Sequence, residues 1–93
     1  MFNCAKLCKG VTFVPLPAAE LDKRVENHNQ SLTLILSEVD MHKGPDGRID
    51  PEWHDSRRCR QLRMNYNNNV RRIHDIDVHG GIRIDEIPAK ELQ

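Results

Sequence analysis

The sequence predicts an α+β fold, in which two antiparallel helices pack with a small antiparallel β-hairpin or a three-stranded sheet. Two observations lead to this prediction. Apolar residues recur with a helical period in two long stretches, Ala18–His42 and Pro51–Ile73. After the second stretch the pattern changes to the alternation that is typical of strands, with apolar residues at Ile76, Val78, Ile82 and Ile84.

The chain has 93 residues, of which 38% are hydrophobic and 30% are charged, so we expect a single folded domain over residues 1–93. Residues 1–10 and 89–93 are expected to form its mobile ends. Three cysteines are an odd number without the spacing of a disulfide framework, which favours reduced thiols and a cytoplasmic protein. No apolar run reaches membrane-spanning length, so no contact with a membrane is expected.

The first helix carries apolar residues at alternating steps of four and three, which is a heptad seam. Such a seam packs either against another helix of the same chain or against a second copy. Leu34 and Leu36 lie outside the seam and favour a second covered surface, so we expect a homo-oligomer. The residues expected to mediate self-association are Val25, His28, Leu32, Ile35 and Val39.

The second helix has a strong start signal, because Asp50 is a good N-cap and Pro51 suits the first turn. Its apolar stripe is expected to comprise Cys59, Leu62, Tyr66, Val70 and Ile73. The tract Asn67–Asn69 weakens the helix by propensity, and it is the point where a break is most expected.

Arginines concentrate in the second helix, where six of them lie between Ser56 and Ile73 without an acidic residue. The flanking segments are acidic, so these charges could neutralise each other within the fold or across a dimer. The alternative is a basic face that binds nucleic acid. That face would consist of Arg57, Arg60, Asn68, Arg71 and Arg72.

The alternating segment is expected to form a hairpin with strands Ile76–His79 and Ile82–Ile87. A three-residue turn would pair Val78 with Ile82 and Asp77 with Arg83, leaving one face apolar. The stretch Val11–Val14 is rich in β-branched and aromatic residues and could supply the third strand.

The segment between the helices, HKGPDGRIDPEW, resembles the second half of the calcium-binding loop of EF-hand proteins. Asp46 and Asp50 fall on ligand positions of that loop, but Trp53 stands where the family has a bidentate glutamate. We therefore interpret the segment as a turn followed by a capped helix start. The residues Asp46, Arg48 and Trp53 are candidates for partner contacts.

Two kinds of chemistry have weak signals. A small zinc-binding domain is an alternative, with the candidate ligands Cys4, Cys8, His74 and His79, although the cysteine spacing is not that of a zinc knuckle. Cys59 lies among arginines that would lower the pKa of an exposed thiol, but its place on the apolar stripe favours a buried, inert thiol. We find no phosphate-binding loop, nucleophile elbow or paired-cysteine motif, so neither catalysis nor a cofactor is expected.

These observations favour a small non-enzymatic protein–protein interaction module. It would act as a regulator or inhibitor by binding a protein partner, like the compact proteins that phages and other mobile elements often encode.

Overall fold

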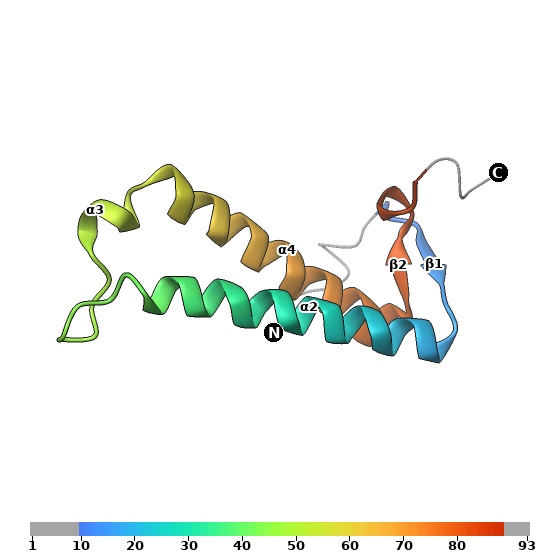
Figure 1. Ribbon diagram of the computed structural model, residues 1–93. Helices are drawn as coiled ribbons and strands as arrows, with labels where there is room; N and C mark the ends of the chain where they lie inside the picture. Colours follow the sequence, from blue (N-terminus) through green and yellow to red (C-terminus); the bar gives the residue numbers. More distant parts are fainter. Residues whose placement is uncertain (1–9, 89–93) are drawn as a thin grey trace.

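The computed structural model describes residues 10–88, which confirm the α+β class (Figure 1). The elements in chain order are β1 (Phe13–Pro15), α2 (Ala18–Asp40), α3 (Pro51–His54), α4 (Arg57–His79), β2 (Gly81–Arg83) and the 3₁₀ turn η1 (Ile84–Glu86). The helices α2 and α4 form an antiparallel hairpin. A loop and α3 lie at one end of this hairpin, and the two strands lie at the other.

The hairpin gives the molecule an elongated shape, with extents of 50 × 28 × 27 Å. Its radius of gyration is 16.2 Å, whereas a compact domain of this length has about 12 Å. Each main helix has 23 residues, and the two lie in a single layer. Most of their length is therefore covered on one side only.

The second predicted helix starts at the expected residue but is not continuous. The Asp50 carboxylate accepts a hydrogen bond from the backbone N–H of Glu52, as an N-cap does, and α3 follows for one turn. Ser56 then starts α4, because its hydroxyl accepts from the backbone N–H of Cys59 and donates to the carbonyl of Trp53. A single serine thus satisfies groups at the end of one helix and the start of the next.

The asparagine tract does not break α4, which runs on to His79. The Asn69 side-chain amide donates to the carbonyl of Asn65 at 2.7 Å, so it is satisfied within the helix. The helix ends at Gly80, which adopts the left-handed conformation (φ 64°) and donates its N–H to the carbonyl of Ile76.

The predicted hairpin is wrong, because residues 76–79 belong to α4. Instead, β2 pairs antiparallel with β1 in a two-stranded sheet, with Val14 opposite Ile82 and Pro15 opposite Gly81. The expected strand Ile82–Ile87 is also too long, since η1 begins at Ile84. The segment predicted as an optional third strand overlaps β1. Among the described residues no third strand joins the sheet.

The buried core is small and lies in two places. Cys59 and Leu62 are 4% exposed and face α2, which confirms the expected buried thiol. Ile76 and Ile82 are buried where α4 meets the sheet. No residue of α2 is fully buried, although its whole length is described. The packing of α4 against α2 therefore leaves every residue of α2 partly accessible to solvent.

Candidate interaction surface

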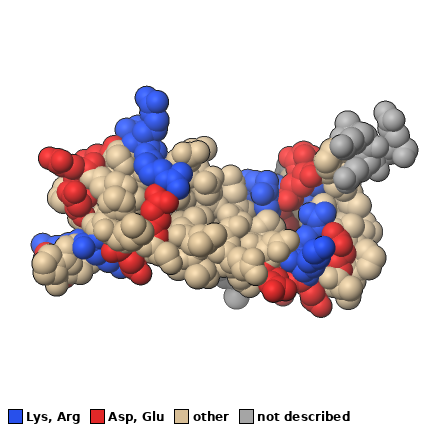
Figure 2. Space-filling view, viewed as in Figure 1, with Lys and Arg blue, Asp and Glu red and all other residues tan. Residues whose placement is uncertain are grey.

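An uncharged belt crosses the middle of the hairpin. Residues 27–37 of α2 and 64–70 of α4 include no Asp, Glu, Lys or Arg. These stretches span about three and two turns, so every side of each helix is uncharged there. Residues 27–33 lie beside residues 64–70, since His28 Nδ1 is 2.8 Å from Asn69 Oδ1, whereas residues 34–37 lie level with the arginine-containing segment 60–63. Figure 2 shows charged residues toward both ends of the visible face and an uncharged band between them.

Large apolar side chains are exposed within the uncharged belt. Leu34 and Met64 are 71% and 66% exposed, and Leu36 and Tyr66 are 51% and 38% exposed. Single exposed apolar residues are common on soluble proteins. These residues are concentrated in a region that itself contains no charges. Covering this surface would therefore lower the free energy.

The predicted heptad seam packs within the chain. The structure places Val25, His28, Leu32, Ile35 and Val39 on α2 as half-buried residues. His28 contacts Asn69 of α4, and Ile35 and Val39 line a groove with Leu62. Of the two roles that the sequence left open, the structure shows packing against the second helix of the same chain.

An apolar groove runs between α2 and α4 on the side of Leu36 and Tyr66, with a volume of about 340 Å³. Val39 and Leu62 contribute to its lining, and Trp53 lies at the α3 end. We call this feature the apolar groove. Leu36 and Tyr66 join the belt to the buried floor of the groove, and its lining also includes the polar residues His54, Arg63 and Asn67.

The opposite side of the hairpin carries a polar groove of about 300 Å³, whose lining includes Ser31, Asn65 and Asn68. Two ion pairs flank it. Arg58 donates two hydrogen bonds of 2.7 Å to Glu38, and Arg72 Nε lies 2.9 Å from Glu86 Oε1. The two sides of the hairpin thus differ in chemistry, and only one of them is apolar.

The loop between the helices is a compact turn, as predicted. Lys43 and Ile49 form an isolated bridge, and the Asp46 carboxylate accepts from the backbone N–H of Arg48. At its base, the rings of His42 and Trp53 stack with centroids 4.0 Å apart. Of the contact candidates, Asp46 and Arg48 are exposed, whereas Trp53 is half-buried against His42.

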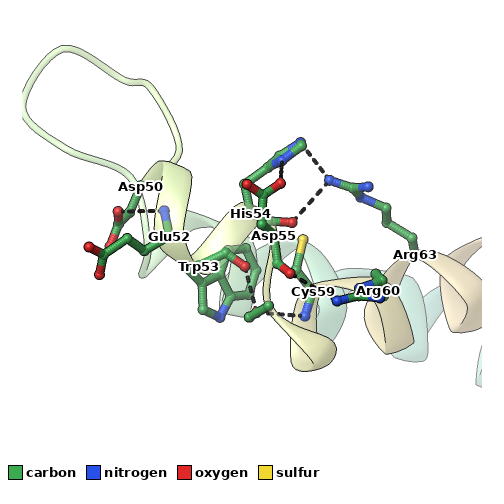
Figure 3. A network of polar contacts seen from close by, with 9 residues as sticks. Asp50, Glu52, Trp53, His54, Asp55, Cys59, Arg60 and Arg63 are labelled. Atoms are coloured by element: carbon green, nitrogen blue, oxygen red, sulfur yellow. Dashed lines mark hydrogen bonds and ion pairs between the residues drawn. The ribbon is translucent and has the colours of Figure 1, made fainter.

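Polar contacts join α3 to the start of α4 (Figure 3). The Arg63 guanidinium donates to the ring nitrogen Nε2 and to the carbonyl of His54, and Arg60 donates to the carbonyl of Asp55. Arg63, to which the sequence assigned no role, and Arg60, a member of the predicted basic face, therefore bridge the break between the two helices.

The residues of the predicted basic face lie on one side of α4, spread along its length, and differ in their contacts. Arg57 and Arg71 are exposed and have no ion-pair partner among residues 10–88, but their positions on α4 are about 21 Å apart. Arg60 contacts a carbonyl, Arg72 is paired with Glu86, and Asn68 lines the polar groove. Nucleic-acid binding stays a prediction from the sequence.

The described part of the zinc alternative does not converge. His74 and His79 lie five residues apart on α4, so they project about 140° apart around the helix. His79 stacks on Phe13 with ring centroids 4.0 Å apart. Within residues 10–88 no group of three or more His, Cys, Asp or Glu could hold a metal ion. Cys4 and Cys8 lie outside the described residues.

One buried ion pair joins α4 to the sheet, and sequence analysis missed it. Arg83 Nε donates to Asp75 Oδ2 at 2.7 Å, and Asp75 is 1% exposed. The predicted hairpin placed Asp77 opposite Arg83, but in the structure Asp77 is exposed. The Arg83 guanidinium also lies 5.8 Å from the centre of the Phe13 ring, so it touches both strands and the helix.

Fold and surface together define a helical hairpin closed at one end by a two-stranded sheet, with an uncharged, partly apolar middle. Within residues 10–88, none of the helices has the length and apolarity that crossing a lipid bilayer requires. Comparisons with protein-family models, with curated proteins and with solved structures find no match to this chain.

The ion pair between Glu38 and Arg58 makes a prediction about pH. The hydrogen bonds from Arg58 lower the pKa of the Glu38 carboxyl. The pair therefore stabilises the fold above the ordinary pKa of a glutamate, and this small contribution is lost as the pH falls through the lowered value. We expect an NMR titration to show the lowered pKa, and the Arg58→Gln variant to return it toward the ordinary value. An equally low pKa in that variant would contradict the assignment.

Proposed function

We propose that this chain is a small non-enzymatic protein–protein interaction module, which regulates or inhibits a protein partner by binding it. The observation that carries the proposal is the uncharged belt with its exposed apolar side chains. The cores of protein interfaces are depleted in charged residues and enriched in Tyr and Met. A partner that covers the belt removes apolar area from water, and the residues of the belt themselves bring no charge into the contact.

The remaining described side chains support a binding role more than a catalytic one. The two grooves of the hairpin are open, and the cysteine among the described residues is buried. Arg48, at the tip of the loop, has a side chain that is 88% exposed and extends the surface that a partner could contact. Trp53 contributes the edge that its stacking on His42 leaves accessible.

Photo-crosslinking tests this proposal. A photoreactive amino acid is placed at Leu34 or Met64 of the full chain, in cells of its natural source, and adducts are identified by mass spectrometry. The matched control is Lys23, which is also exposed on α2 but lies outside the belt. We expect a discrete adduct with one protein from both belt positions and none from Lys23. No adduct from the belt, or the same adducts from all three positions, would refute the proposed function.

A further inference from the structure

We propose that a second copy of the chain covers the apolar groove beside Leu36 and Tyr66, so that two hairpins form a four-helix bundle. This inference rests on the proposed function, because it names one partner for the interaction surface. It leaves Leu34 and Met64 outside the interface, since they lie on other sides of α2 and α4, available to a different protein.

The first argument is the incomplete core of the hairpin. A helix in a folded protein obtains most of its stability from packing an apolar face, yet α2 contains no fully buried residue. Its half-buried seam is covered by α4 on one side, while Leu36 is 51% exposed beside the apolar groove. A second pair of helices over this groove would complete the bundle core that one pair begins.

The second argument is self-complementarity. The uncharged belt lies near the middle of both helices, because residues 27–37 fall within Ala18–Asp40 and residues 64–70 fall within Arg57–His79. A two-fold axis through the belt therefore places the uncharged residues of one copy on those of the other, with Arg63 of the groove beside this contact. The same axis keeps the charged ends of both copies away from the centre. An unrelated partner would have to provide a matching uncharged stretch, which a second copy already has.

The third argument is area. A helix of 23 residues is about 34 Å long and about 10 Å wide, so the face of two helices offers about 700 Å². Stable interfaces bury about 600–1,000 Å² on each partner. The hairpin face is thus large enough for a dimer, and loop residues near Trp53 add to it.

Analytical ultracentrifugation of the full chain over a wide concentration range tests the dimer, with two leucine variants as a matched pair. Leu36→Asn changes the groove, whereas Leu34→Asn changes an exposed leucine two positions earlier, on another side of the same helix. We expect a dimer that Leu36→Asn weakens at least about tenfold. Leu34→Asn should leave its dissociation constant unchanged. Circular dichroism checks that both variants remain helical.

Each other outcome overturns the inference. A monomer at every concentration excludes the second copy, and a dimer that Leu34→Asn weakens as much as Leu36→Asn places the interface elsewhere. If Leu36→Asn loses its helicity, a photoreactive amino acid at Leu36 in the folded chain decides: a covalent dimer supports the inference, and its absence refutes it. A monomer that still crosslinks another protein from Leu34 or Met64 would refute the dimer and leave the proposed function standing.

Discussion

Replacing Arg83 with alanine is expected to lower the free energy of unfolding by about 3–5 kcal/mol, because it leaves the buried carboxylate of Asp75 without its counter-charge. The Arg83 side chain is 14% exposed and that of Asp75 is 1% exposed, so water cannot replace the lost hydrogen bonds. Chemical denaturation of wild type and variant measures the difference.

Arg58→Ala is the matched control. Its ion pair with Glu38 has the same 2.7 Å geometry, but both side chains are accessible to solvent. We expect this variant to unfold almost like the wild type, because exposed ion pairs contribute little. The double variant Asp75→Leu with Arg83→Leu should recover part of the stability lost in Arg83→Ala, since it removes the buried charge as well. If the two single variants had equal effects, burial would not be what makes the Arg83 pair important.

The sequence could not identify this pair, because the choice between Asp75 and Asp77 depends on whether the segment is a helix or a strand. In a strand, Asp77 lies opposite Arg83 across a three-residue turn, as we predicted. In α4, Asp75 faces the sheet and Asp77 faces solvent. The apolar residues do not decide between these structures, since Ile76 lies at a helical spacing of three from Ile73 and at a strand spacing of two from Val78.

Local signals were more informative than long-range ones. Capping by Asp50 and the turn before it depend on neighbouring residues only, and both predictions are confirmed. The pairing of β2 with β1 depends on residues that are far apart in sequence, and no local pattern specifies it. Ser56 is the intermediate case. Serine is a good N-cap, so Ser56 could mark a helix start. The apolar stripe of the second helix favours one continuous helix instead, so the sequence predicts no start at Ser56.

The sequence alone identifies part of the candidate surface. The absence of charge from residues 27–37 and 64–70 is visible without a structure. That residues 27–33 lie beside residues 64–70 follows only once the helices are known to be antiparallel and their register is known. Leu36 lies outside the heptad seam and can be singled out from the sequence, whereas Met64 has no periodic signal that would single it out.

The second large effect is expected at Gly81, the first residue of β2. It is buried, and a Cβ atom there would lie 2.2 Å from the carbonyl oxygen of Val14 and 2.8 Å from its carbonyl carbon. Backbone atoms of a paired strand cannot move aside as the end of a flexible side chain can. The Gly81→Ala variant must therefore separate the two strands, and we expect it to lose about 3 kcal/mol of stability or more.

Hydrogen exchange locates the damage caused by Gly81→Ala. The backbone N–H of Ile84 donates to the carbonyl of Thr12 at 2.9 Å, so its protection reports on the contact between the two segments. We expect this protection to be lost in Gly81→Ala, while amides in the middle of α4 keep theirs. The control is Gly44→Ala, where the nearest atom is a side-chain oxygen of Asp46 at 3.2 Å, which can shift. If Gly81→Ala kept the protection of Ile84, the close approach of the strands at Gly81 would be wrong. The pairing of β1 with β2 would then have to be held in a different register.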